Sequence, residues 1–148
     1  MNKIDLQKWA YCLILFFMTL SGFAQMPIFK RYYIADIPGL GWLAEFYITH
    51  LIHYAAASIL IGFAFYYLAD FILKGKRAEM ITRTGRFGFT VLAGLIISGI
   101  LMVVKNLDAV FFPHPMVIAL NLVHLSLCIL ILGLSGYTVW QKKKWVAS

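Results

Sequence analysis

The sequence predicts an all-α membrane protein, an up-down bundle of four transmembrane helices. Apolar residues make up 62% of the chain and charged residues 13%, and the mean hydropathy is +0.83, whereas soluble domains are roughly half apolar. The apolar residues gather in four long segments, and the basic residues gather in alternate loops. We therefore expect residues 1–148 to form a single membrane domain whose core lies between helices.

The four apolar segments are each near or above the ~18–20 residues that cross the hydrocarbon core. We predict spans at about residues 9–28, 44–73, 86–105 and 114–140. Three short connections separate them: a loop rich in Pro, Gly and Tyr at 27–41, a basic loop at 74–86 and a mixed turn at 105–114. None of these connections is long enough to fold alone.

The first apolar segment has a second interpretation. Lys3 and Lys8, the apolar stretch, and then Gly22-Phe23-Ala24 resemble a secretory signal with a small-residue cleavage site. The apolar stretch continues past the alanine to Ile28, so we expect the segment to be retained as a span. Cleavage would leave three spans.

The basic residues predict the topology. Ten of the thirteen fall on one side of the predicted spans: Lys3, Lys8, Lys74, Lys76, Arg77, Arg83, Arg86, Lys142, Lys143 and Lys144. The other side holds Lys30, Arg31 and Lys105. By the positive-inside rule both termini are expected to lie in the cytoplasm. The membrane that we expect for this multi-pass protein is a prokaryotic cytoplasmic (inner) membrane. The positive charge flanks spans instead of forming a patch with stacking residues, so no nucleic-acid partner is expected.

Two histidines are predicted to lie inside the membrane, where an ionisable side chain is costly and indicates a functional site. His53 lies eight residues after Glu45, at ~12 Å depth, and His124 nine residues after Pro115, at ~13 Å. Two imidazoles at one depth on different helices are what a bis-histidine haem iron needs. We predict that His53 and His124 ligate the iron of a b-type haem. The alternative is that each makes an interhelical hydrogen bond.

Small residues near the predicted haem would leave room for the macrocycle. Residues 55–58 read Ala-Ala-Ala-Ser after His53, and the first and third spans offer Gly22 and Gly99 at similar height. Taken alone, such glycines indicate only close helix packing. Cys12 and Cys128 have no CxxC spacing and are interpreted as small buried apolar residues.

The remaining polar residues near the outer side have weaker assignments. His50 lies one turn above His53 and cannot ligate the same iron from that side, so we interpret it as a quinone contact, a propionate partner or a packing residue. Asp36 and Glu45 are proton acceptors for a quinol, or simply solvated charges. His114 is interpreted as an interfacial side chain.

The outer basic residues also have two interpretations. Lys30, Arg31 and Lys105 are expected either to pair with haem propionates or, for the first two, to reach lipid phosphates. The cofactor-binding set predicted from the sequence is therefore His53, His124, His50, Lys30, Arg31 and Glu45.

Several of these features together resemble a known family. They are Lys8-Trp9 opening the first span, Ser21-Gly22-Phe23 closing it, the Pro-containing loop, His53 in the second span and His124 in the last. The layout is similar to the four-helix cytochrome b subunit of membrane-bound formate dehydrogenases, related to those of nickel-iron hydrogenases and thiosulfate reductases. The resemblance covers nearly the whole chain. It implies two haems stacked across the membrane, and His53 and His124 match the outer pair of ligands.

The sequence departs from that family at the inner haem, whose two ligand positions read Lys8 and Thr138. We therefore expect one haem, in the outer half of the bilayer. The resemblance implies electron transfer between a quinone and an iron-sulfur or multihaem cytochrome c subunit. The chain has no iron-sulfur or molybdenum ligand set of its own, so it is expected to be an electron-transfer subunit that is not catalytic alone.

Two other classes of function compete with this one. The first is a haem-free membrane anchor or quinone-binding subunit of an oxidoreductase complex. The second is a small transporter or channel, for which the sequence lacks inverted repeats and interrupted helices.

Overall fold

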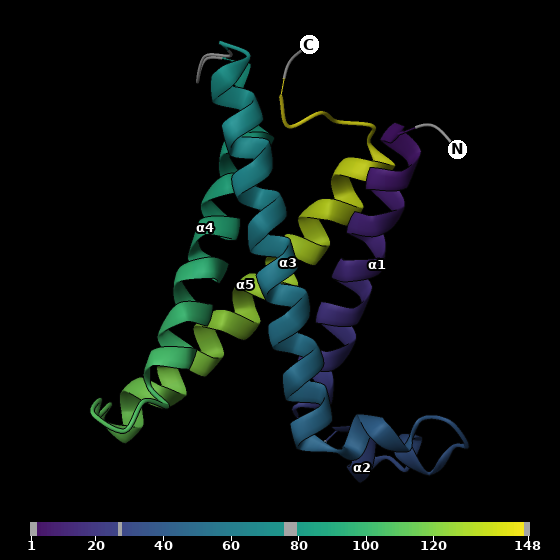
Figure 1. Ribbon diagram of the computed structural model, residues 1–148, viewed down its shortest axis with the longest axis vertical. Coiled ribbons are helices and arrows are strands. Elements are labelled where there is room, and N and C mark those ends of the chain that lie inside the picture. The colour runs from purple at the N-terminus through teal and green to yellow at the C-terminus, as the bar shows by residue number, and fades with distance from the viewer. Residues whose placement is uncertain (1–2, 27, 76–79, 147–148) are drawn as a thin grey trace. The chain divides into compact units, whose positions relative to one another are not determined.

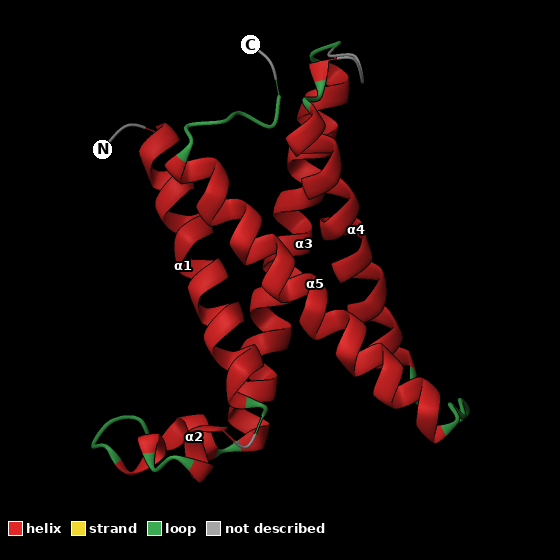
Figure 2. Cartoon of the chain, turned by 180° about the vertical axis from the view of Figure 1, so that it is seen from behind, coloured by secondary structure: helices red, strands yellow, loops and turns green. Residues whose placement is uncertain are grey.

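The computed structural model describes residues 3–26, 28–75 and 80–146, with the side chains of residues 3–8 and 28 excepted. Within these ranges the chain is built from helices joined by short loops (Figures 1 and 2). The helices are α1 (Lys3–Ala24), α2 (Ile28–Arg31), η1 (Ile34–Asp36), η2 (Gly41–Ala44), α3 (Phe46–Leu73), α4 (Arg83–Val104) and α5 (His114–Trp140). Because a bilayer core offers no water to the backbone, apolar segments of this length satisfy their peptide groups as helices.

Three of the helices in the described part are long and apolar enough to cross a membrane, namely α3, α4 and α5. Their bounds lie within three residues of the segments predicted from the sequence. Only 6% of the most apolar stretch of α3, and 6% of that of α5, is buried within the chain. Side chains this apolar and this exposed have their natural surroundings in lipid, and the chain is therefore treated as a membrane protein.

Helix α1 differs from these three. Within the part of this 22-residue helix whose side chains are described, the apolar stretch is Trp9–Ala24, which is shorter than the ~18–20 residues of a full span. The helix ends at Ala24, whereas the predicted first span continued to Ile28. Pro27 follows closely in the sequence, and a proline disfavours helical geometry at the residue before it. The first of the four spans stays a prediction.

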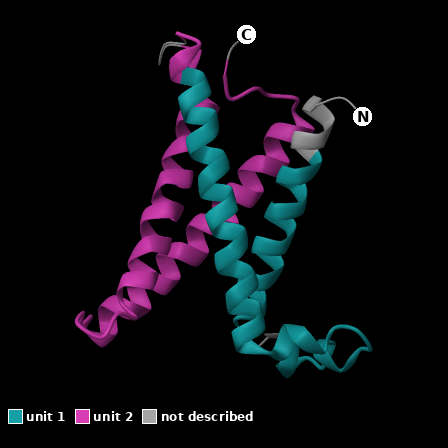
Figure 3. Ribbon diagram, viewed as in Figure 1, with its two compact units in different colours: residues 1–71 teal, residues 72–148 magenta. Residues whose placement is uncertain are grey.

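The chain divides into two compact units, residues 1–71 and residues 72–148, which are coloured separately in Figure 3. In the first unit α1 and α3 are joined by α2, η1 and η2, which pack together at the end of α1. Ser21 on α1 and Thr49 on α3 are fully buried, and Leu43 of η2 is 3% exposed. The connection between the predicted first two spans thus has helical structure of its own.

The second unit is built from α4 and α5. Its core is a cluster of Val91, Leu95 and Ile131, and the partly buried residues packed against it include Cys128 and Trp145. The Cys128 side chain is therefore partly buried in apolar surroundings, whereas Cys12, which was also predicted to be buried, is exposed within the chain.

The C-terminal segment folds back onto the start of α4, within the second unit. Thr82 caps α4 by accepting a hydrogen bond from the backbone N–H of Gly85 at 3.0 Å. The Thr82 hydroxyl and its backbone N–H both donate to the carbonyl oxygen of Trp145, at 3.1 and 3.0 Å. The Trp145 indole lies against Gly88 and meets Phe89 edge-on, with ring centroids 5.5 Å apart. We call this arrangement the C-terminal clasp.

The residues that carry the charge bias are only partly within the described regions. Lys76 and Arg77 lie outside them, as do the side chains of Lys3 and Lys8. The topology inferred from these charges remains a prediction.

Candidate functional site

His53 is held by α1, the neighbouring long helix of its own unit. Its Nδ1 atom lies 3.0 Å from the backbone carbonyl oxygen of Met18 and 3.3 Å from the hydroxyl oxygen of Ser21. Because a carbonyl oxygen only accepts, Nδ1 carries the proton and donates it. A neutral imidazole in this tautomer has its basic lone pair on Nε2, the kind of nitrogen that ligates iron.

The Ser-Gly pair at the end of α1 fits against this imidazole. Ser21 donates its own hydroxyl proton along its helix, with the Phe17 carbonyl oxygen at 2.6 Å, so hydroxyl lone pairs are left for the histidine. A Cβ atom at Gly22 would lie 3.0 Å from Cε1 of His53. This is tighter than side chains normally pack, so a glycine lets α1 approach the ring.

The same arrangement occurs in the second unit. The Nδ1 atom of His124 on α5 lies 2.8 Å from the hydroxyl oxygen of Ser98 on α4. The Ser98 hydroxyl also lies 3.0 Å from the carbonyl oxygen of Leu95, to which it can donate. Toward His124 it accepts from Nδ1 in one histidine tautomer and donates to Nδ1 in the other. Gly99 follows, and a Cβ atom there would lie 3.5 Å from Cε1 of His124, an ordinary contact.

His53 fits the role of an iron ligand, since the Met18 carbonyl places its proton on Nδ1 and leaves the basic lone pair on Nε2. His124 faces a hydroxyl, which accepts from Nδ1 in that same tautomer. The two histidines belong to different compact units, each described by itself, and their pairing across one iron stays a prediction. His53 lies seven residues after the start of α3 and His124 ten residues after the start of α5. At 1.5 Å per residue these are ~10 and ~15 Å along the helices, a wider spread than the sequence estimate gave.

His50 is enclosed by contacts within the first unit. Its ring stacks on Phe46 with centroids 5.1 Å apart and lies 4.1 Å from the ring of Tyr54. Its Nδ1 atom lies 3.3 Å from the side-chain oxygen of Gln25 on α1. The aromatic neighbours fix the ring plane, and the amide fixes one nitrogen as a donor.

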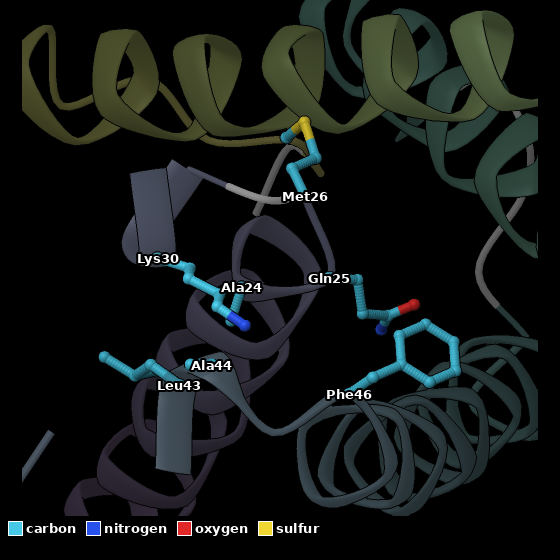
Figure 4. Close-up of a pocket in the computed structure, with 7 residues that line it drawn as sticks. All are labelled: Ala24, Gln25, Met26, Lys30, Leu43, Ala44 and Phe46. Carbon is cyan, nitrogen blue, oxygen red and sulfur yellow. The ribbon is translucent and has the colours of Figure 1, made fainter. Parts of the chain in front are cut away.

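A small pocket opens beside His50, where α1, α2, η2 and α3 meet (Figure 4). Its volume is about 190 Å³, and its wall consists of Ala24, Gln25, Met26, Lys30, Leu43, Ala44 and Phe46. The polar groups of this wall are the Lys30 ammonium and the Gln25 amide, and the amide lies beside the Phe46 ring. Two of the wall residues, Gln25 and Phe46, are the ones that contact His50.

The charged residues predicted for the site lie at exposed positions. Asp36, Glu45, Lys30 and Arg31 are all exposed. The backbone carbonyl oxygen of Glu45 accepts from the N–H and the hydroxyl of Thr49, at 3.0 and 3.2 Å, which anchors the first turn of α3.

The predicted residues of the second unit have local contacts. Lys105 donates to the side-chain oxygen of Asn121 at 3.4 Å. His114 is exposed at the first residue of α5. Thr138, at one of the family's inner ligand positions, is buried and donates to the carbonyl oxygen of Ser135 at 2.9 Å. The side chain of Lys8, at the other position, lies outside the described part.

Sequence reasoning missed the partners of the two histidines. It interpreted Gly22 and Gly99 as room for a macrocycle, whereas both lie against the histidine rings themselves. A signal did exist in the repetition of Ser-Gly at 21–22 and 98–99, each in the helix that precedes a histidine-bearing helix. A backbone acceptor such as the Met18 carbonyl leaves no signal in a sequence.

Comparison of the chain with protein-family models, with curated proteins and with solved structures finds no match.

Proposed function

We propose that this chain is a membrane cytochrome b subunit, which transfers electrons between a quinone pool and a partner oxidoreductase subunit. His53 and His124 would hold one b-type haem in the outer half of the bilayer, between four spans that include α1. The partner would be an iron-sulfur or multihaem cytochrome c subunit. The chain would sit in a prokaryotic cytoplasmic membrane with both termini inside, as its charge pattern indicates.

The main support for the proposal is the burial of the two imidazoles and the oxygen atom that lies next to Nδ1 of each. Each comes from a long apolar helix and is half-buried. Each has Nδ1 next to an oxygen of a neighbouring helix, at 3.0 Å for His53 and 2.8 Å for His124. Histidines that ligate metals donate their second ring N–H in this way, which fixes the ring and raises the basicity of the ligating nitrogen.

A low-spin haem with two imidazole ligands supplies one-electron transfer between its ferrous and ferric states. The work of the protein is then to hold both imidazoles neutral and correctly turned, and to exclude water from them. Asp36, Glu45, Lys30 and Arg31, at exposed positions, are candidates for proton uptake and for pairing with propionates.

The quinone is proposed to bind at the pocket beside His50. Quinone carbonyl oxygens accept hydrogen bonds, and the Lys30 ammonium and the Gln25 amide are donors in its wall. The volume of about 190 Å³ is below the ~300–1,000 Å³ of pockets for drug-sized ligands, so it would take the ring while the isoprenoid tail stays in lipid. His50 contacts the wall residues Gln25 and Phe46, and its Nδ1 already donates to Gln25, so a proton released from a quinol would have to reach its Nε2.

One specific observation favours a second candidate, a haem-free membrane anchor that binds quinone. The interhelical hydrogen bonds of His53 and His124 already satisfy one nitrogen of each ring, as expected of histidines that serve only to join helices. In that case the pocket beside His50 would be the functional site by itself.

A reduced-minus-oxidised absorption spectrum with a pyridine haemochrome count on the purified complex separates the two candidates. We expect a sharp low-spin α band and one haem b per chain. Absence of haem from a folded complex that still binds quinone would favour the anchor. A count of two haems would overturn the single-haem assignment.

A further inference from the structure

We propose that the C-terminal clasp builds a binding site for the phosphate headgroup of an anionic phospholipid. The site is the basic cluster, which consists of Arg83, Arg86, Lys142, Lys143 and Lys144. It lies within the second unit and involves neither a histidine nor haem. The inference therefore goes beyond the proposed function and does not depend on it.

The clasp brings two basic segments of the chain together at one end of the second unit. The hydroxyl oxygen of Thr82 lies 3.0 Å from the carbonyl oxygen of Lys144, across 62 residues of sequence. Arg83 directly follows Thr82, and Arg86 lies one helical turn further on, where its backbone N–H donates to the Thr82 carbonyl oxygen at 2.8 Å. All five residues of the basic cluster are exposed. The fold-back of the chain therefore gathers cations that would otherwise lie on separate segments.

The basic cluster has few carboxylates of its own unit near it. Residues 72–148 contain two acidic residues, Glu79 and Asp108. Glu79 lies outside the described residues, and Asp108 lies beyond the far end of α4, a helix of 22 residues or ~33 Å. No described residue of this unit therefore brings a carboxylate to the cluster. An anion bound among these cations would offset their mutual repulsion.

One cation of the cluster is held in place by α5. The Lys143 ammonium donates to the hydroxyl oxygen of Tyr137 at 2.6 Å and lies 4.7 Å from the centroid of the same ring. The backbone N–H of Lys143 donates to the Thr138 carbonyl oxygen at 2.9 Å. An ammonium group has three donors, so two of them remain for an anion. The lysine segment therefore has a defined place beside the last turn of α5.

Exposed aromatic side chains place the cluster at the level of lipid headgroups. Trp140, the last residue of α5, is 81% exposed, and Tyr137 and Phe87 are 43% and 51% exposed. Tryptophan and tyrosine gather at the boundary between hydrocarbon and headgroups. Because α4 and α5 are both long and apolar enough to cross a membrane, the cations just beyond these rings lie at the depth of lipid phosphates.

This position favours a lipid over an acidic protein segment. Clusters of about four to eight basic residues beside a membrane-spanning helix attract anionic headgroups, and each residue strengthens the attraction about five-fold. A phospholipid places its phosphate among the cations and its acyl chains along the exposed aromatic and apolar side chains. A protein segment bound to the same cations would leave the Trp140 ring in contact with lipid alone.

The test measures lipid binding to the full chain in a nonionic detergent by native mass spectrometry. The probes are phosphatidylglycerol, which is anionic, and phosphatidylcholine, which is zwitterionic, with the same acyl chains. We expect the parent protein to bind phosphatidylglycerol at least about ten-fold more tightly. Inorganic phosphate should not displace it, because phosphate has no acyl chains. Equal affinity for the two lipids, or full displacement by phosphate, would overturn the inference.

A charge-matched pair of variants separates the site from general surface charge. One variant replaces the three lysines of the cluster with glutamine, and its affinity for phosphatidylglycerol should fall about ten-fold or more. The control removes three positive charges that the sequence predicts on the other side of the membrane, by the combined substitutions Lys30→Gln, Arg31→Gln and Lys105→Gln. Its affinity should change about two-fold at most. An equal loss in both variants would mean that net charge is responsible, and would exclude the site.

The clasp itself is tested by variants that keep every positive charge. A Cβ atom at Gly85 would collide with the Trp145 carbonyl, and one at Gly88 would lie 2.7 Å from the Trp145 indole. Gly85→Ala and Gly88→Ala should each release the C-terminal segment and weaken phosphatidylglycerol binding about five-fold, the effect of about one basic residue. Gly133→Ala is the control and should bind like the parent protein, because a Cβ atom there would meet no described atom within 4 Å. If both Gly85→Ala and Gly88→Ala bind phosphatidylglycerol as tightly as the control does, the clasp does not build the site.

Discussion

The backbone carbonyl oxygen of Met18 on α1 lies 3.0 Å from Nδ1 of His53 on α3. This bond joins two helices across 35 residues of sequence and assigns the proton on the imidazole. A side-chain substitution at Met18 leaves the carbonyl in place, so the orientation of His53 is a property of the helix pair. The predictions for haem binding assume this orientation of the His53 imidazole.

The ligand assignment predicts that His53→Ala and His124→Ala each abolish the low-spin haem spectrum, because a bis-imidazole iron loses an axial ligand. His50→Ala should keep the low-spin band, since His50 is bonded to Gln25 and stacked on Phe46. His114→Ala, at an exposed position, is the control. The measurement is the absorption spectrum of each purified variant. A low-spin band retained in His53→Ala and lost in His50→Ala would place the ligand one turn away.

The two glycines against the histidine rings should respond unequally to alanine. At Gly22 the new Cβ would lie 3.0 Å from Cε1 of His53, and at Gly99 it would lie 3.5 Å from Cε1 of His124. Gly22→Ala should turn the ring and weaken haem retention by ~1–3 kcal/mol, the usual cost of overpacking, whereas Gly99→Ala should be tolerated. Haem content after titration with apomyoglobin as a haem acceptor measures the difference. Equal retention in both variants would contradict the packing at Gly22.

The C-terminal clasp predicts a structural effect at Gly85, where a Cβ atom would collide with the Trp145 carbonyl. Gly85→Ala should detach the C-terminal segment and speed trypsin cleavage after Lys142, Lys143 and Lys144, which are already exposed, with a loss of ~1–3 kcal/mol of stability. Trp145→Ala should speed cleavage at the same sites. Gly133→Ala on α5 is the control, because a Cβ atom there would meet no atom of the described residues within 4 Å. Equal trypsin resistance of Gly85→Ala and the parent protein would exclude the clasp.

The proposed quinone site predicts that Lys30→Gln and Gln25→Leu raise the KM for quinol of the assembled complex several-fold, since each removes a hydrogen bond worth ~1 kcal/mol. Arg31→Gln is the matched control, because Arg31 is the exposed neighbour of Lys30 and is not among the residues of the pocket wall. Haem content should stay at the parent level in all three variants. If the control changes KM as much as Lys30→Gln does, general surface charge is responsible and the pocket is not.

The charge pattern predicts the topology of the chain. A reporter fused after Ser148, or inserted between Lys76 and Glu79, should report the cytoplasm, and one inserted near Asp36 should report the outside. Protease accessibility of the three fusions in intact cells gives an independent reading. A cytoplasmic signal at Asp36 would reverse the orientation and move the proposed haem to the inner half of the bilayer.

The membrane character and the three long apolar helices could be predicted from the amino-acid sequence alone. Length and hydropathy suffice for this, because a segment of more than ~18 apolar residues must satisfy its backbone within itself and is stable only as a helix in lipid. The same reasoning singled out His53 and His124, since an imidazole among apolar neighbours is conspicuous in the sequence. It also extended the first span beyond Ala24, where α1 ends.

The hydrogen-bond partners of each histidine could not be predicted from the sequence and became visible only in the folded chain. The Nδ1 partners are an oxygen of a serine 26 residues away for His124, and a carbonyl 35 residues away for His53. Ser21-Gly22 and Ser98-Gly99 are visible in the sequence, but their contacts depend on the rotation of each helix about its axis. In lipid that rotation is set by side-chain packing and interhelical hydrogen bonds rather than by an apolar face turned away from water. Helices such as α3 and α5 are apolar on all sides, so their sequences contain no periodic pattern of apolar and polar residues from which the rotation could be predicted.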